Sequence, residues 1–239
     1  MNRDEVQVWQ TRLGGSDEIQ AAFELLDDAE RARARRYRVQ NAHDMFVTAR
    51  ALLRQTLGYY LGIAPAAVAL RYAPYGKPEL ECQSDLRFNL SHSGDTAVLA
   101  VSRGREVGID IEEANRDVDA AGLAKRFFSS VEVAWVTSHL GELIQQAFFT
   151  CWTGKEAYLK ARGNGLRFPL DAFEVLPKSN GPKLNLKVYG DPEETRRWSM
   201  LQLKVGVGLS AAIAVEGSGW TLRMCKLPQS AFRSNATTP

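Results

Sequence analysis

Two parts of the sequence each place a long helical pattern ahead of a series of short strand patterns, and this order restricts the fold. In the first part, apolar residues recur at helical intervals over 42–61. Strand patterns follow it near 67–72, 87–90 and 95–102. In the second part, a long helix is predicted over 142–161. The strand patterns that follow this helix lie near 171–176, 183–189, 198–205, 208–215 and 220–226.

Shorter elements complete both parts. A strand over 5–13 and a helix from Ser16 precede a second helix near Asp27, and another helix covers 119–128. Two short helices have the spacing of a capping box at their starts, in the pairs Asp27 with Glu30 and Ser129 with Glu132.

The patterns predict an α+β protein with a pseudo-twofold arrangement of two similar α/β halves, each a small, mainly antiparallel sheet packed with helices. The expected boundaries are 1–105 for the N-terminal half, 106–227 for the C-terminal half and 228–239 for a loose tail. No repeat is visible in the sequence itself, so the duplication is inferred from the order of elements alone.

The composition is that of an ordinary globular chain, with 45% apolar and 24% charged residues among 239. A net charge of +2 does not indicate a nucleic-acid partner, and the apolar stretches are too short to span a bilayer. Asp4 and Glu5 precede any apolar run, which argues against a signal peptide, and the three cysteines have neither disulfide nor zinc spacing. We therefore expect a cytoplasmic protein.

The segment EVGIDIE (106–112) reads as a strand that carries two carboxylates on one face. Because alternate side chains of a strand share a face, Asp110 and Glu112 point the same way, about 6–7 Å apart. Val107, Ile109 and Ile111 then point into a core. Two neighbouring carboxylates repel each other and resist desolvation, so a positive charge is expected between them.

A third acid lies in the long helix, within CWTGKEAYLKARGNGL (151–166). Glu156 and Lys160 are four residues apart and share a helix face, whereas Lys155 is rotated by about 100°. A surface ion pair is the ordinary explanation of such spacing. Gly154 costs the helix about 1 kcal/mol relative to alanine, which indicates a packing or functional reason for it.

The segment RFNLSHSGDTAVLAVS (87–102) places His92 in a predicted polar loop between two strands, with Ser91 and Ser93 beside it. Such a loop can present hydroxyls, backbone N–H groups and an imidazole to an anion, although a histidine serving only the turn is equally compatible. A serine–histidine nucleophile pair is disfavoured, because adjacent residues of an extended segment point apart.

An arginine run, AERARARRYR (29–38), contains five cations, among them Arg31 and Arg33. A solvated helix face is the usual meaning of a charge run, but these arginines lack compensating acids and would favour phosphate or an acidic protein. Lys77 adds an isolated cation in the turn YGKPE (75–79).

Together the acids, Lys160, the histidine segment and the basic helix favour a hard divalent cation bound to a polyphosphate, because carboxylates without His or Cys partners suit Mg²⁺. The sequence contains neither GxxxxGK[ST] nor GxGxxG, so P-loop and dinucleotide-binding sites are excluded.

These residues resemble a known family. GIDIE, followed about forty residues later by WTGKEAYLK, is similar to the paired signature of the 4′-phosphopantetheinyl transferases, and best to the longer, Sfp-type branch with both halves in one chain. Further blocks that look like the family's occur in the same order: YGKPE, FNLSHSGD, KRFFSSVE (125–132) and GNGLRFPLDAF (163–173). The resemblance covers roughly 27–175 and implies the 4′-phosphopantetheinyl transferase fold.

The resemblance implies transfer of the phosphopantetheine arm of coenzyme A onto a serine of an apo acyl or peptidyl carrier protein, with release of 3′,5′-ADP. It implies that Asp110, Glu112 and Glu156 bind Mg²⁺, and that Glu156 is the base for the serine hydroxyl, directly or through water. Lys160 is implied to contact the phosphates and to act in catalysis.

For the rest of coenzyme A, the resemblance implies that Ser91 and His92 contact phosphate and that Lys77, Arg31 and Arg33 hold the nucleotide end. It also implies a monomer with no membrane or nucleic-acid partner. Two alternatives stay open: an Mg²⁺-dependent phosphodiesterase that hydrolyses coenzyme A, and a non-catalytic subunit that binds carrier proteins.

Overall fold

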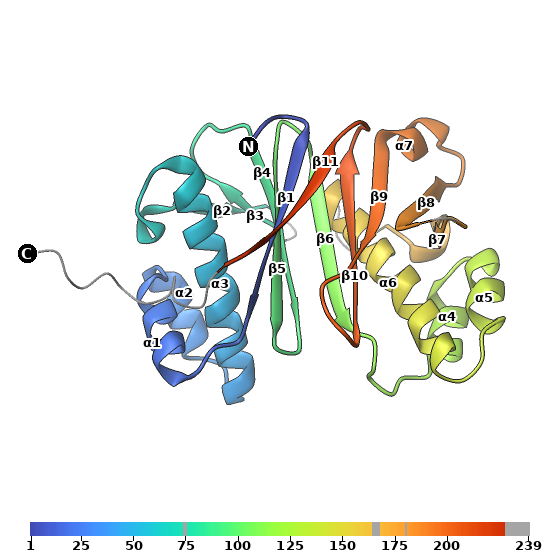
Figure 1. The fold of residues 1–239 in the computed structure, drawn as a ribbon, viewed down its shortest axis with the longest axis horizontal. Coiled ribbons are helices and arrows are strands. Elements are labelled where there is room, and N and C mark those ends of the chain that lie inside the picture. Colours follow the sequence, from blue (N-terminus) through green and yellow to red (C-terminus); the bar gives the residue numbers. More distant parts are fainter. Residues whose placement is uncertain (74–75, 164–167, 180, 228–239) are drawn as a thin grey trace, which may run out of the picture.

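Two β-sheets stand side by side in the middle of the molecule, with helices on both flanks (Figure 1). The computed structural model describes residues 1–73, 76–163, 168–179 and 181–227. The first sheet has the strand order β11-β1-β5-β4. Its strands are β1 (Glu5–Arg12), β4 (Leu86–Ser93), β5 (Thr96–Arg103) and β11 (Thr221–Lys226). The ladders of β1 and β4 with β5 are antiparallel, and β11 runs parallel to β1.

The second sheet has the strand order β6-β10-β9-β8-β7, with antiparallel ladders. Its strands are β6 (Val107–Glu113), β7 (Phe173–Pro177), β8 (Lys183–Val188), β9 (Trp198–Leu203) and β10 (Leu209–Glu216). A short hairpin of β2 (Leu70–Tyr72) and β3 (Pro78–Leu80) stands apart from both sheets.

Each sheet is covered by one long helix on its outer face. Helix α3 (Gln40–Leu61) packs on the first sheet through a buried cluster that includes Leu53, Leu57 and Leu99. Helix α6 (Glu142–Arg162) packs on the second sheet. The inner faces of the two sheets share a further cluster that joins Val8 and Val98 to the apolar face of β6. The molecule is therefore layered as helix, sheet, sheet, helix (Figure 1).

Smaller helices flank the two long ones. They are α1 (Ser16–Glu24), α2 (Asp28–Ala34), α4 (Ala120–Phe127), α5 (Ser130–Thr137), α7 (Pro192–Arg197) and the 3₁₀ turns η1 (Pro65–Ala67) and η3 (Leu170–Ala172). Both predicted capping boxes are present, with reciprocal hydrogen bonds between Asp27 and Glu30 and between Ser129 and Glu132. Within the described part of the chain, no helix is long and apolar enough to cross a membrane.

The α+β class and the succession of sheets and long helices are confirmed. Helix α6 ends at Gly163, which takes a left-handed conformation (φ 79°). The patterns missed β3 and α7. They placed the strand of 67–72 too early, because a 3₁₀ turn extends to Ala67 and the strand begins only at Leu70. The division at residue 105 stays a prediction; β11 joins the sheet of β1. The expected tail, 228–239, lies outside the described residues.

Candidate active site

Strand β6 and helix α6 approach so closely that glycine is required at their crossing. A Cβ on Gly108 would lie 2.1 Å from the carbonyl oxygen of Ala157 and 2.2 Å from the backbone nitrogen of Ala161. Residues 108, 110 and 112 share a strand face. The crossing therefore brings the face that carries Asp110 and Glu112 against the turn of α6 that carries Glu156 and Lys160.

A second glycine allows α6 to pack tightly on the second sheet. A Cβ on Gly154 would lie 2.5 Å from Cγ1 of Val175 on β7. The packing reason expected for this glycine is thus confirmed.

Side chains of β4 bind β6 along the line where the two sheets meet. The Oδ1 atom of Asn89 accepts a hydrogen bond from the backbone N–H of Ile109 at 2.9 Å, and the Ser91 hydroxyl donates to Oδ1 of Asp110 at 2.9 Å. The predicted loop around His92 was wrong at this point: residues 91–93 continue strand β4, because the ladder with β5 extends to the last residues before the turn.

The next serine of β4 completes the same line. The Ser93 hydroxyl donates to Oε2 of Glu112 at 3.1 Å and accepts from the backbone N–H of Glu113 at 3.1 Å. Arg116, just past the end of β6, donates to the same Oε2 of Glu112 at 2.7 Å. Glu112 is therefore held by one hydroxyl and one guanidinium.

Lys160 reaches Asp110 from α6. Its Nζ lies 2.5 Å from Oδ1 of Asp110 and 3.0 Å from Oγ of Ser91. Asp110 is only 4% exposed, and its second oxygen, Oδ2, is buried without a hydrogen-bond partner among the described residues. A buried carboxylate oxygen with no donor is costly, so this atom is suited to bind a cation.

The three acids of the site influence one another. Burial raises the pKa of Glu156, and so do the negative charges of Asp110 and Glu112, while Lys160 opposes the shift. Burial and then Asp110 raise the pKa of Glu112, against the effect of Arg116. Like charges that disfavour each other's ionisation are the arrangement expected of a cation site.

Asp110, Glu112 and Glu156, the predicted metal ligands, do not form a metal-binding cluster in the described structure. In the described ranges, no group of three His, Cys, Asp or Glu side chains is arranged to hold a metal ion. Asp110 and Glu112 instead turn to two protein cations, Lys160 and Arg116. Burial raises the pKa of Glu156, and the residue is near enough for the charges of both acids to raise it further. The metal role of the three acids stays a prediction.

His92 belongs to the same neighbourhood. The residue keeps a solvent-exposed side, yet partial burial of its imidazole lowers the pKa, and the Lys160 ammonium lowers it further, against the smaller opposing effect of Asp110. The imidazole is therefore neutral near pH 7, and it can offer an N–H group to a ligand.

Lys77 has a different partner. Its Nζ lies 3.5 Å from Glu106, which also binds Arg87 at 2.8 Å, and burial of the ammonium lowers the pKa of Lys77. The side chain lines a hollow of about 330 Å³ together with Arg71 and Arg87. The nucleotide contact of Lys77 stays a prediction.

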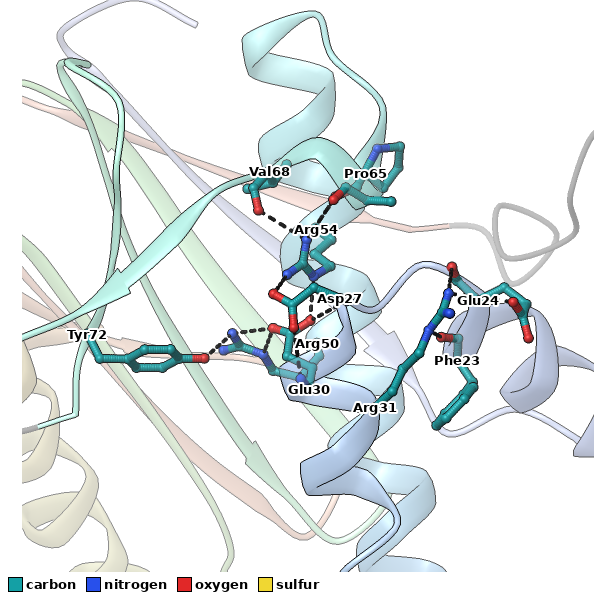
Figure 2. A network of polar contacts seen from close by, with 11 residues as sticks. Phe23, Glu24, Asp27, Glu30, Arg31, Arg50, Arg54, Pro65, Val68 and Tyr72 are labelled. Carbon is teal, nitrogen blue, oxygen red and sulfur yellow. Dashed lines mark hydrogen bonds and ion pairs between the residues drawn. The ribbon is translucent and has the colours of Figure 1, made fainter.

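Arg31 and Arg33 lie on α2, the helix that also carries Glu30 of the buried ion-pair network in Figure 2. Arg31 turns toward the end of α1, where it donates to the carbonyls of Phe23 (3.3 Å) and Glu24 (2.7 Å). The guanidinium of Arg33 lies over the ring of Phe46, 5.0 Å from its centre. Arg31 therefore caps α1, and a nucleotide contact for either arginine stays a prediction.

The network itself fixes α2 on α3. The carboxylate of Glu30 is 3% exposed and binds both Arg50 and Arg54, and Arg50 also donates to the Tyr72 hydroxyl at 2.7 Å (Figure 2). A buried charge is tolerated when it is paired and hydrogen-bonded, as here. The basic helix and the hairpin β2–β3 are thus joined to the same long helix.

Lys155 has a structural partner that the sequence did not reveal. Its side chain is fully buried, and Nζ lies 2.8 Å from Glu132 on α5. Nζ also donates to the backbone carbonyls of Leu170 (2.6 Å) and Phe173 (2.5 Å). With three acceptors the ammonium is fully satisfied, so Lys155 fixes α6 against α5 and β7 rather than facing Asp110.

Three features were not predicted: the contacts of Ser93 with β6, the ion pair of Arg116 and the Glu132–Lys155 pair. A signal for Ser93 was present, because Asn89, Ser91 and Ser93 recur with the period of two that a strand requires. No local pattern announces Arg116, which meets Glu112 only because the chain turns after β6.

Comparisons with known proteins show the family of this chain. A family model described as the 4′-phosphopantetheinyl transferase superfamily matches residues 106–215, and one described as the N-terminal part of a 4′-phosphopantetheinyl transferase matches 9–104. The 4′-phosphopantetheinyl transferase HetI of Nostoc sp. is 38% identical over 91% of this chain and 90% of its own length.

Two proteins of Bacillus subtilis are also similar. One 4′-phosphopantetheinyl transferase is 33% identical over 70% of this chain and 72% of its own length, and the transferase Sfp is 27% identical over 73% and 76%. This chain belongs to the 4′-phosphopantetheinyl transferase family.

Proposed function

We propose that this protein transfers the 4′-phosphopantetheine arm of coenzyme A to a serine of an apo carrier protein, with release of 3′,5′-ADP. The observation that carries the proposal, beside family membership, is the convergence of Asp110, Glu112, Glu156 and Lys160 at the crossing of β6 and α6. This convergence combines paired acids with a cation, which phosphoryl-type transfer requires.

Mg²⁺ fits the donor set of the site. The three carboxylates supply hard oxygen ligands, and the buried Oδ2 of Asp110 lacks a donor in the described part of the protein. Asp110, Glu112 and Glu156 would hold the ion, with the remaining positions left to water and pyrophosphate. When bound, it would neutralise charge on the pyrophosphate and so lower the electrostatic barrier to attack.

Lys160, Ser91 and His92 are assigned to the phosphates of coenzyme A. Lys160 and Ser91 already contact each other and Asp110, so a pyrophosphate held there would meet an ammonium and a hydroxyl together. The neutral imidazole of His92 offers a further donor. Lys160 is expected to stabilise the charge that develops on the departing 3′,5′-ADP.

Glu156 is assigned as the general base. Burial and the charge of Asp110 raise its pKa, which makes it a stronger base than an ordinary carboxylate, while Lys160 opposes the shift. The carrier serine loses its proton to Glu156, directly or through water. Its oxygen then bonds to the phosphorus on the pantetheine side as the bond to the bridging oxygen breaks, which leaves the electron pair on 3′,5′-ADP.

In this proposal Lys77, Arg31 and Arg33 contact the nucleotide end of coenzyme A. Five arginines over 29–38 also suit an acidic carrier protein. We place the enzyme in the cytoplasm as a monomer.

The test is a carrier-modification assay with coenzyme A, Mg²⁺ and apo carrier, read by mass spectrometry. The carrier is expected to gain one phosphopantetheine arm. Glu156→Gln should lower the rate about 10²–10⁴-fold with the fold retained, whereas Glu193→Gln, on exposed α7, should leave it unchanged. Normal turnover by Glu156→Gln would remove Glu156 from the mechanism.

The same assay separates the two alternatives. Consumption of coenzyme A at the same rate without carrier would identify a phosphodiesterase. Binding of carrier that is equal with and without Mg²⁺, and that leaves the carrier mass unchanged, would identify a non-catalytic subunit.

A further inference from the structure

Three contacts hold Arg116 at the end of β6, and one of them is an ion pair with Glu112. Its NH2 group donates to Oε2 of Glu112 at 2.7 Å, and its Nε donates to the backbone carbonyl of Glu113 at 3.3 Å. Its guanidinium also lies over the ring of Phe149 on α6, 5.4 Å from the ring centre. The guanidinium therefore lies at the end of β6 and occupies Oε2 of Glu112, an oxygen that would be a ligand of a metal ion in the site.

The two counter-ions of the site differ in how firmly they are held. Lys160 binds Asp110, whose side chain is 5% exposed, and it also binds Ser91. Arg116 is 47% exposed and Glu112 is 23% exposed. Ion pairs with this much solvent access are weak, so a divalent cation with twice the charge can replace the guanidinium.

The surroundings give Arg116 room to move away. It lines a hollow of about 570 Å³ with polar side chains, among them Gln202 and Ser210, and with two acids, Asp117 and Glu142. Ser210 is the ladder partner of Glu112 on β10, so the hollow begins beside this acid. A guanidinium that leaves Glu112 stays hydrated there and can form new hydrogen bonds.

We propose that Arg116 is a displaceable counter-ion: it pairs with Glu112 in the metal-free protein and gives up this carboxylate when the divalent cation binds. The inference rests on the proposed function in placing Glu112 among the metal ligands. Arg116 thereby sets the affinity of the site, because binding must break its ion pair and overcome its positive charge.

The test is direct binding of Mn²⁺, as a substitute for Mg²⁺, to the full-length protein without coenzyme A, measured by titration calorimetry. Arg116→Gln is expected to bind Mn²⁺ about two- to fivefold more tightly than the wild type, the range that a half-exposed ion pair implies. The matched control is Arg126→Gln, because Arg126 is an exposed residue of α4 whose guanidinium also lies over a phenylalanine ring, that of Phe127 (5.0 Å). It should bind as the wild type does.

A second measurement follows the arginine itself. The Nε–H resonance of Arg116 is expected to shift when Mg²⁺ saturates the wild-type protein, while that of Arg126 stays in place. Equal or weaker Mn²⁺ affinity in Arg116→Gln, or an unmoved Arg116 resonance, would overturn the inference alone. Failure of the wild type to bind Mn²⁺ at millimolar concentration would overturn the metal assignment with it.

Discussion

Replacement of Gly108 by alanine tests whether the close packing of β6 on α6 sets the geometry of the active site. The new Cβ would lie 2.1 Å from the carbonyl oxygen of Ala157 and 2.2 Å from the nitrogen of Ala161. Both are backbone atoms, so no side-chain rotation can relieve the contact. Ordinary contact begins at 3.4 Å, so strand and helix must separate by roughly 1 Å or more.

This displacement reaches the chemistry directly. Glu156 and Lys160 adjoin Ala157 and Ala161 on α6, so both must move relative to Asp110 when the helix withdraws. A misplacement of about 1 Å in a catalytic site can cost about 10²-fold in rate. Overpacking costs about 1–3 kcal/mol, less than the 5–15 kcal/mol stability of a typical domain, so Gly108→Ala should remain folded.

The assay is the carrier-modification rate at saturating coenzyme A and carrier, with folding followed by circular dichroism. The expected result is a folded protein whose kcat falls about 10²-fold. Gly15→Ala is the matched control, because Gly15 has an ordinary φ of −72° and a Cβ there would meet nothing within 4 Å. A folded Gly108→Ala with the wild-type kcat would show that this contact does not set the site.

Two further predictions concern Lys155 and His92. Lys155→Met leaves Glu132 buried without its cation, so the free energy of unfolding in urea titrations should fall by about 3–5 kcal/mol. The control Lys187→Met replaces an exposed lysine and should change this free energy little. Similar values for the two variants would contradict a structural role of Lys155. The pKa of His92, measured by NMR, should lie below 6.5 in the free protein, because burial favours the neutral ring. It should rise when coenzyme A binds, because a nearby phosphate favours the imidazolium. A pKa that stays constant on binding would place the phosphates elsewhere.

Local patterns were sufficient where a single element decides the outcome. Alternation along 106–112 put Asp110 and Glu112 on the face opposite the buried Ile109, and capping-box spacing located the starts of α2 and α5. These features depend only on backbone geometry within a few residues, so the local sequence is enough to predict them.

Patterns failed where a distant element decides the outcome. Ser91 and His92 lie in a run of small polar residues, which is typical of a loop, but pairing with β5 extends the strand through them. Helical spacing shows that Lys155 points away from Glu156, yet only the packing of α5 and of Leu170 shows what it meets there. The parallel pairing of β11 with β1 joins residues more than two hundred positions apart and has no local signal.

The same kind of buried ion pair holds a short helix against each of the two long helices, although the sequence shows no repeat. In each half, the glutamate that completes the capping box of a short helix also binds a buried cation of the long helix: Glu30 binds Arg54 on α3, and Glu132 binds Lys155 on α6. A buried carboxylate requires both kinds of partner, so the short helix cannot shift along the long one without exposing an unpaired charge. In the second half the residue after the cation is Glu156. The pairing of Lys155 therefore fixes the rotation of α6 that turns Glu156 toward β6, and a support shared by both halves becomes part of the active site in one of them.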